Sequence, residues 1–180
     1  MRAISLLLLL LLLLFLASTS VHAAAAEKQN FYYFGEVKIS AATGQPMPSQ
    51  VILLEKTHDP EKNLIIERAI TIKPDGTSDD HTVTLTVKDN DFTLVDDAHS
   101  VTGTGKLFGP AWAWTYFKAT FKATNGVTIE DENFLADPSA AVARKKIIAP
   151  DGKVIMYMDV TLKTVTPETF KVLSKALLKK

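Results

Sequence analysis

The sequence predicts an all-β protein: an antiparallel up-and-down β-barrel of about eight to ten strands with one C-terminal α-helix. Three observations predict this class. Short runs rich in β-branched and aromatic residues recur along the chain, tight-turn signals separate them, and a helical period appears only at the end. Because tight turns join sequential neighbours, the pattern favours a barrel over a sandwich, whose Greek keys need long crossing connections.

The first residues predict a secretory signal peptide over residues 1–23, followed by a single barrel domain over residues 24–180. Arg2 precedes an almost unbroken leucine run, and a small-residue cleavage site ends at Ala23. The run is short for a membrane span, and an uncleaved anchor is the alternative. We therefore expect an exported protein, periplasmic or secreted, with no integral membrane span after cleavage.

Composition excludes several classes of protein. The chain contains no cysteine, which excludes disulfides, a lipid-modified cysteine and thiolate metal sites, and which fits a bacterial envelope. The formal net charge is zero, so no electrostatic case for nucleic acid exists. Neither a cofactor motif nor a metal motif is present, and we expect no cofactor. The oligomeric state is left open.

The strands follow one another at short intervals. We expect them over residues 31–39, 50–56, 64–72, 81–88, 92–95, 99–107, in a hairpin within 112–136, and over 141–149 and 154–162. Asp59-Pro60, Pro74-Asp75-Gly76 and Pro150-Asp151-Gly152 provide turn chemistry between them. These signals predict a meander.

Asn125-Gly126 is the strongest hairpin signal, and it predicts a two-residue type I′ loop. Phe121 then lies opposite Glu130, and one face carries Glu130 and Glu132 beside phenylalanines. Facing inward, the two acids would form a desolvated pair with a raised pKa and acid–base potential; facing outward, they are surface charges. We favour the outward orientation.

The end of the chain predicts a helix over about residues 167–178. Thr166 is a suitable N-cap, Pro167 suits the first helical position, and apolar residues from Phe170 onward recur at helical spacing. We expect the apolar stripe to cover one end of the barrel; the alternative is that the lysine face contacts anionic lipid.

This layout resembles the lipocalin-like (calycin) β-barrels, in particular small uncharacterised bacterial exported or lipid-associated families. The local features are Gly103-Thr104-Gly105 leading to Trp112-Ala113-Trp114, the Asn-Gly turn, the Pro-Asp-Gly turn and the TPETF helix start. The Gly-x-Trp signature of the lipocalins proper is missing, since residues 31–37 read FYYFGEV. The resemblance implies an up-and-down barrel with an apolar cavity and no chemistry.

Six residues are candidates for ligand binding. Trp112, Trp114 and Tyr116 are expected on one face, either as core or as a stacking platform at a pocket mouth. If the Pro-Asp-Gly turn sets the register, Arg144 falls opposite Met158 and beside Met156, facing inward, where it would need a carboxylate partner. The alternative, which we favour, is a one-residue bulge that turns Arg144 to solvent, or snorkelling of its side chain at the barrel rim.

The histidines give no metal-ligand spacing. Asp80-His81 and Asp97-Ala98-His99 each open a strand, and we expect solvated turn residues there. No nucleophile motif is present. The leading hypothesis is therefore an exported, non-enzymatic protein that holds a small apolar or amphipathic ligand, with lipid as the natural candidate. The alternatives are a filled-core structural or interaction module of the cell envelope, and an enzyme using Glu130, Glu132 or Arg144.

Overall fold

The computed structural model describes residues 27–96, 98–110, 112–137 and 139–178. In these segments the chain forms ten β-strands, a short 3₁₀ turn and one C-terminal α-helix. The predicted signal peptide, residues 1–23, lies outside the described residues. Across the described segments, no helix is long and apolar enough to cross a membrane.

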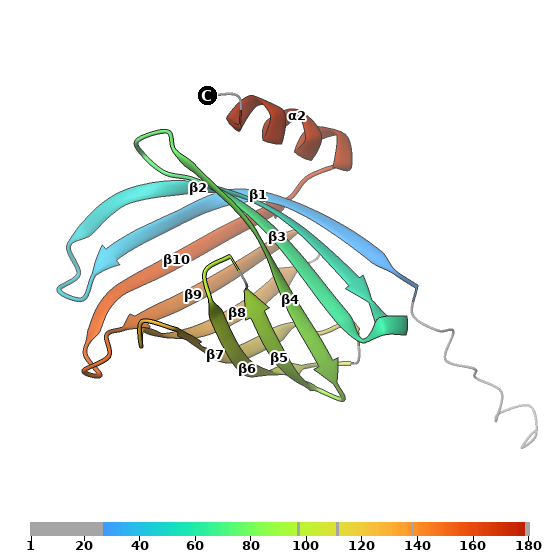
Figure 1. The fold of residues 1–180 in the computed structure, drawn as a ribbon. Helices are drawn as coiled ribbons and strands as arrows, with labels where there is room; N and C mark the ends of the chain where they lie inside the picture. The colour runs from blue at the N-terminus through green and yellow to red at the C-terminus, as the bar shows by residue number, and fades with distance from the viewer. Residues whose placement is uncertain (1–26, 97, 111, 138, 179–180) are drawn as a thin grey trace, which may run out of the picture.

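The ten strands close into an antiparallel barrel, in which each strand pairs with its neighbours in sequence and β10 pairs with β1 (Figure 1). The strands are β1 (Gln29–Ala41), β2 (Pro46–Asp59), β3 (Leu64–Ile72), β4 (Ser78–Lys88), β5 (Asp91–Asp96), β6 (Val101–Phe108), β7 (Tyr116–Ala123), β8 (Thr128–Asp137), β9 (Ala140–Ile148) and β10 (Val154–Thr164). The predicted all-β, up-and-down barrel is confirmed.

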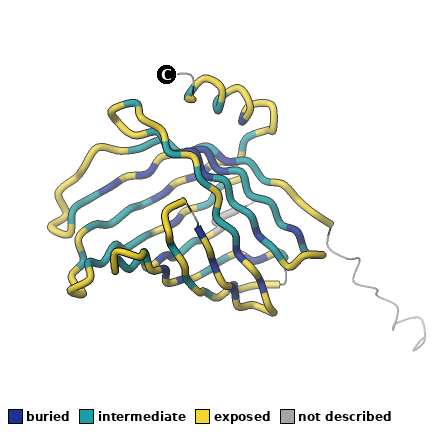
Figure 2. The backbone as a smooth tube through the Cα atoms, viewed as in Figure 1, coloured by how far each residue is buried: buried dark blue, intermediate teal, exposed yellow. Residues whose placement is uncertain are grey.

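The inward residues of the strands form two apolar clusters inside the barrel. One lies along β3 to β7 and the other along β1, β2, β9 and β10. Exposed positions alternate with more buried ones along β4 to β7, as Figure 2 shows, because successive side chains point to opposite faces. Gly103 and Gly105 allow aromatic rings to lie against β6: a Cβ at Gly103 would be 2.3 Å from Phe121 Cδ1. Both glycines lie within a strand and not in a phosphate loop.

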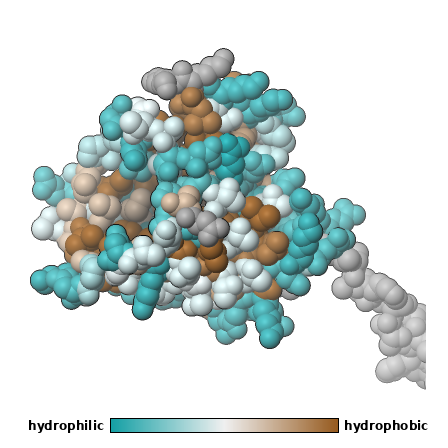
Figure 3. Space-filling view, viewed as in Figure 1, coloured by the Kyte–Doolittle hydropathy of each residue, from teal (hydrophilic) through white to brown (hydrophobic). Residues whose placement is uncertain are grey.

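Helix α2 (Pro167–Leu177) packs on the outer wall of the barrel, and the expectation that it covers a barrel end is wrong. Phe170 is buried together with Leu53 of β2 and Ile70 of β3, and its ring lies 5.2 Å from that of Tyr32. The outward residues Tyr32, Phe34 and Ile72 pack against this cluster and are themselves apolar, so this part of the wall needs a cover. Figure 3 shows hydrophilic residues over the outer side of the helix and hydrophobic residues where it meets the barrel.

The hairpin between β7 and β8 has a three-residue loop, so the expected two-residue register is wrong by one position. The amide of Ala123 donates to the carbonyl of Val127, and Gly126 has a positive φ of 84°. Of the described loop residues, Gly126 alone has positive φ, whereas a type I′ loop needs two such residues. Phe121 therefore pairs with Ile129 instead of Glu130.

The hairpin between β9 and β10 closes as expected at Ala149 and Lys153 but changes register within its first residues. An irregularity between Val154 and Met156 places Arg144 opposite Asp159 on the outer wall. The inward orientation of Arg144 is therefore wrong, and the bulge alternative is confirmed.

Candidate functional site

The barrel encloses a cavity of about 400 Å³ at the end of the barrel where β1 begins and β2 ends. Its wall comprises Gln29, Phe31, Tyr33, Ile52, Leu54, Lys56, His58, Ile65, Glu67, Ala69, His81, Val83, Leu85, Leu107, Trp112, Ala113, Trp114, Thr115, Tyr116, Phe117, Asp131, Asn133, Phe134, Ala141, Ala143, Lys145, Val160 and Leu162. Most of these side chains are apolar or aromatic. The volume lies within the range of small-molecule sites, about 300–1,000 Å³.

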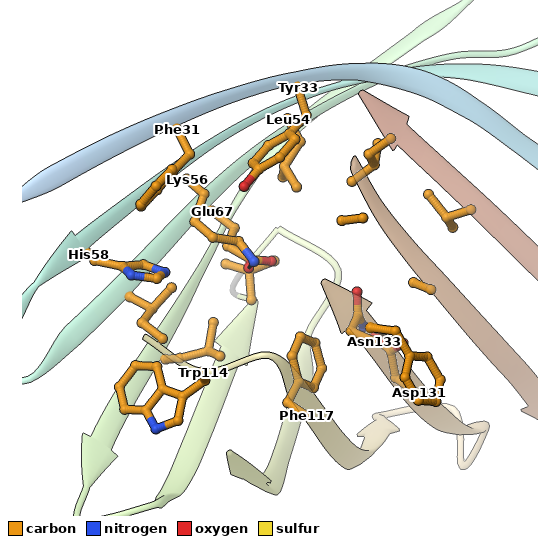
Figure 4. Close-up of a pocket in the computed structure, with 18 of the residues that line it drawn as sticks. Phe31, Tyr33, Leu54, Lys56, His58, Glu67, Trp114, Phe117, Asp131 and Asn133 are labelled. Carbon is orange, nitrogen blue, oxygen red and sulfur yellow. Dashed lines mark hydrogen bonds and ion pairs between the residues drawn. The ribbon is translucent and has the colours of Figure 1, made fainter. Parts of the chain in front are cut away.

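Two ion pairs lie among these apolar side chains. Lys56 Nζ of β2 lies 2.6 Å from Glu67 Oε1 of β3, and Lys145 Nζ of β9 lies 3.1 Å from Asp131 Oδ2 of β8. Each pair joins residues directly opposite on adjacent strands. Figure 4 shows Lys56 and Glu67 reaching into the cavity, with Asp131 and Asn133 on the strand across it.

The two pairs lie close enough to influence each other. Lys56 Nζ lies 6.0 Å from the ring centroid of Phe117 on β7, so the lysine reaches toward the opposite wall. Lys145 contributes to lowering the pKa of Glu67, and Glu67 contributes to raising the pKa of Lys145. We call the four residues Lys56, Glu67, Asp131 and Lys145 the lumen quartet. Its formal charge is zero when all four groups are ionised.

Burial and pairing oppose each other in the quartet. Burial lowers the pKa of Lys56, but attraction to Glu67 and their hydrogen bond outweigh it, so the net pKa is raised. The same pair lowers the pKa of Glu67 despite burial. For Asp131, whose side chain is 4% exposed, burial dominates and raises the pKa in spite of Lys145. Asp131 is therefore the acid of the quartet whose pairing does not outweigh its burial.

Aromatic rings surround the mouth of the cavity. The rings of Trp112 and Trp114 lie 4.9 Å apart, each lies 6.2 Å from His58, and His58 lies 5.0 Å from Phe31. Trp114 Nε1 donates to Asn90 Oδ1 at 3.2 Å, which holds the indole in place. Burial lowers the pKa of His58 to about 4, and its enclosed Nδ1 makes no hydrogen bond. The mouth thus presents a neutral, apolar surface at neutral pH.

The structure brings only some of the predicted ligand-binding residues together. Trp112 and Trp114 meet at the mouth, in the connection before β7. Tyr116 also borders the cavity, but its ring packs against those of Phe108 and Phe134 and not against the tryptophans. The three aromatics therefore all border the cavity, but Tyr116 belongs to a separate ring cluster from the two tryptophans.

Of the predicted ligand-binding residues on β9 and β10, only the two methionines point inward. Arg144 lies on the outer wall, where its Nε donates to Asp159 Oδ1 at 2.9 Å. Met156 and Met158 point inward and pack against the cluster of β1, β2, β9 and β10. In β10, Val160 and Leu162 border the cavity, and the two methionines lie nearer the start of the strand.

The acids of β8 also follow the corrected register. Glu130 pairs with Lys146 and Glu132 with Lys118, both at 2.7 Å on the outer wall. The outward orientation favoured for Glu130 and Glu132 is confirmed. The acid that faces the cavity is Asp131, which lies between them.

Sequence reasoning missed the lumen quartet and His58, although a signal for half of the quartet was present. Residues 130–132 are three consecutive acids and residues 144–146 three consecutive bases. Because side chains alternate between faces, every register places at least one charge of each run inside. Two facing runs of opposite sign predict an inward ion pair, whichever residues provide it.

No protein-family model and no curated protein matches the sequence. Among solved structures, the barrel is similar to a protein of unknown function from the DUF3598 family of Nostoc punctiforme, with a TM-score of 0.58 and 11% identity. The match covers 75% of this chain and 47% of that chain, so this chain spans about half the length of the Nostoc protein. The likeness shows the fold alone and is consistent with a lipocalin-like barrel.

Two dehydratase structures also match. One is the dehydratase domain of PpsC from Mycobacterium tuberculosis in complex with C12:1-CoA, at 10% identity over 75% of this chain and 76% of that chain, with a TM-score of 0.23. The other is an N-terminal dehydratase from the difficidin assembly line, at 7% identity over 83% of this chain and 82% of that chain, with a TM-score of 0.27. Scores this low carry no argument.

Proposed function

We propose that this chain is an exported, non-enzymatic binding protein that holds one small apolar or amphipathic molecule in its barrel, a lipid being the natural candidate. The observation that carries the proposal is the cavity of about 400 Å³ with its mostly apolar wall. A filled-core interaction module would leave no such space, because protein interiors are normally packed without voids of this size. Export rests on the signal peptide predicted from residues 1–23.

The wall supports an amphipathic ligand better than a purely apolar one. Leu54, Leu107 and Val160 offer apolar contact, whereas the lumen quartet offers ammonium donors and carboxylate acceptors at one level of the cavity. A polar group of the ligand would exchange hydrogen bonds with a quartet that is already neutral overall. Such a site would fix the orientation of the ligand without requiring a particular ligand charge.

The positions of the candidate catalytic residues speak against the enzyme alternative. Glu130, Glu132 and Arg144 lie on the outer wall in ion pairs, away from the cavity. Among the described residues that line the cavity, His81 lies 3.1 Å from the Asp79 carboxylate, but no serine or threonine hydroxyl is hydrogen-bonded to its ring as a nucleophile requires. Binding is therefore the activity that the wall supports.

Native mass spectrometry of the mature protein, purified from its own compartment and followed by organic extraction, tests the proposal. We expect a 1:1 adduct that extracts as an apolar or amphipathic compound. If the purified protein is empty, it should take up fatty acids or phospholipids on titration. Both tryptophans of the chain lie at the cavity mouth, so intrinsic fluorescence reports uptake directly. An empty protein that takes up none of these compounds would overturn the proposal.

Two neighbouring residues of β9 provide a matched pair of variants. Ala143 lines the cavity and is 4% exposed, whereas Val142 lies on the outer wall and is 40% exposed. Ala143→Phe should fill the cavity and abolish the adduct, and Val142→Phe should retain it. Leu107→Phe is a second cavity-filling variant should Ala143→Phe fail to fold. Equal uptake by the filled and control variants would place the ligand elsewhere.

A further inference from the structure

Two histidines and two aspartates gather at the end of the lumen away from the aromatic mouth. Asp79 and His81 lie on the inner face at the start of β4, Asp96 ends β5, and His99 lies in the turn before β6. We call these four residues the rim cluster. They come from the two Asp-His segments that the sequence analysis assigned to solvated turns. Asp97 lies outside the described residues, and Asp80 points outward to Arg68.

The distances within the rim cluster converge on a single carboxylate oxygen. His81 Nδ1 and His99 Nε2 each lie 3.1 Å from Asp79 Oδ2. One ligand atom from each of Asp79, His81 and His99 lies within 4.8 Å of the others. Neighbouring ligand atoms of a tetrahedral zinc ion are about 3.3 Å apart, given bond lengths of about 2.0–2.1 Å.

Asp96 supports this arrangement from behind. Its Oδ2 lies 2.8 Å from His99 Nδ1, and its Oδ1 accepts the backbone amide of His99 at 3.2 Å. A carboxylate bound to one ring nitrogen directs the other nitrogen toward a metal, as in carboxylate–histidine–zinc triads. Asp96 is itself buried, at 6% exposure. It therefore fixes the orientation of His99, with Nε2 toward Asp79.

Two further features suit a cation site. His81 Nδ1 is enclosed and makes no hydrogen bond, although Asp79 Oδ2 lies only 3.1 Å away. Ion pairs elsewhere on the described strands join an acid to a lysine or an arginine. Within the described part of the chain, Asp79 and Asp96 instead pair with His81 and His99 alone. The two carboxylates of the cluster would offset the charge of a divalent ion.

We propose that Asp79, His81 and His99 bind a divalent transition-metal ion, with Asp96 as the supporting carboxylate. Two imidazoles and one carboxylate, without thiolates, suit Zn²⁺, and the same ligands accept Cu²⁺, Ni²⁺ and Co²⁺. Three protein ligands leave a fourth position open on a tetrahedral ion. Because His81 also lines the main cavity, the ion would adjoin the lumen. The proposal is independent of the bound small molecule.

Isothermal titration of the metal-free mature protein with Zn²⁺, without an affinity tag, tests this site. We expect one Zn²⁺ per chain, and Co²⁺ in its place should give the intense visible absorption of a tetrahedral complex. His99→Ala and Asp79→Asn should abolish binding. Asp96→Asn should weaken it by about 10- to 100-fold, the usual effect of removing a supporting carboxylate.

The chain offers matched controls for each variant. His58→Ala removes the histidine at the cavity mouth, and Asp80→Asn removes the outward neighbour of Asp79; both should bind Zn²⁺ like the wild type. Circular dichroism of every variant without metal shows whether it folds. Asp79→Asn, at a half-buried position, tests the site if His99→Ala does not fold. No stoichiometric binding by the wild type, or equal binding by Asp79→Asn and Asp80→Asn, would overturn the site.

Discussion

The outer wall beneath helix α2 and the inner wall around the cavity differ in how tightly they are packed. Leu53 and Ile70, the largest fully buried side chains described, lie outside the barrel under Phe170 of the helix. The inner wall instead borders a cavity of about 400 Å³ and carries two ion pairs. The outer side of β1 to β3 is thus closely packed where the inner side of the same strands borders a cavity.

Strand β2 contains both environments in consecutive residues. Leu53 faces the helix and is fully buried, while Leu54 faces the cavity and is 9% exposed. The alternation of side chains along a strand separates the two by one position. A substitution at each therefore compares the two walls with the residue type, the strand and the neighbouring backbone held constant.

The largest effect is expected for Leu53→Ala. The closely packed site beneath the helix should leave a cavity and lower the free energy of unfolding by about 3–4 kcal/mol. Leu54→Ala should lower it by about 1–2 kcal/mol, because its side chain already borders empty space and creates less new cavity. Urea unfolding followed by circular dichroism measures both.

Ligand uptake should respond in the opposite order. Leu54→Ala should alter the affinity for an amphipathic ligand because it enlarges the cavity, whereas Leu53→Ala should leave affinity unchanged wherever the protein is folded. Equal destabilisation by the two variants would show that the two walls are equally packed, and the contrast between them would then be wrong.

A smaller effect is expected for Lys56→Met, which leaves the Glu67 carboxylate unpaired in the cavity wall. Breaking a fully buried pair costs about 3–5 kcal/mol, and we expect about 2–3 kcal/mol here because both groups border the cavity. The double variant Lys56→Met/Glu67→Met should recover most of this loss, because no unpaired charge remains. Urea unfolding of the single and double variants measures the coupling.

The outer wall supplies the control for that pair. Lys118 and Glu132 pair at a similar distance, 2.7 Å, but the lysine is exposed to solvent. Lys118→Met should leave the unfolding midpoint unchanged, since exposed ion pairs contribute little. If Lys118→Met lowered the free energy of unfolding as much as Lys56→Met does, an unpaired charge would be no more destabilising in the lumen than on the outer wall.

The next effect is a dependence of stability on pH that originates at His58. Its pKa is about 4 in the folded protein and about 6.5 when unfolded, so the unfolded chain binds the extra proton between these values. Stability from this group is complete above pH 6.5 and is lost as the pH falls toward 4. Between pH 7 and pH 5 we expect a loss of about 1–2 kcal/mol.

The variant His58→Phe isolates this contribution. It keeps an aromatic ring at the mouth but removes the titrating group, so its stability should fall less than that of the wild type between pH 7 and pH 5. Other titrating groups are common to both proteins and cancel in the comparison of their urea unfolding curves. An identical pH dependence in the two proteins would show that His58 titrates freely in the folded state.

The sequence predicted the architecture because the architecture depends on local signals. The Pro-Asp-Gly turns and the Thr166 N-cap act within a few residues, and the structure has hairpins and a helix at those places. The meander of short connections then leaves few alternatives to a closed barrel.

The candidate site was harder to predict because it depends on register. Adding Thr124 to the loop exchanged Glu130 and Glu132 for Asp131 on the inner face, and one irregularity after Val154 exchanged Arg144 for Lys145. A shift of one residue moves every side chain of a strand to the other face. The geometry of the loop and the packing across the lumen decide such shifts, and neither is visible in one strand alone.

The smallest effect is expected for Arg144→Ala. Arg144 was a candidate ligand-binding residue on the hypothesis that it faces inward, but its side chain is 72% exposed and pairs with Asp159 on the outer wall. The variant should retain the wild-type unfolding midpoint and the wild-type affinity for an amphipathic ligand. Lys145→Met is the matched inner-wall variant, one residue further along β9: it leaves Asp131 unpaired and should change both properties. If Arg144→Ala weakened ligand binding while Lys145→Met did not, the register of β9 would be shifted by one residue and the lumen quartet would lose its partner for Asp131.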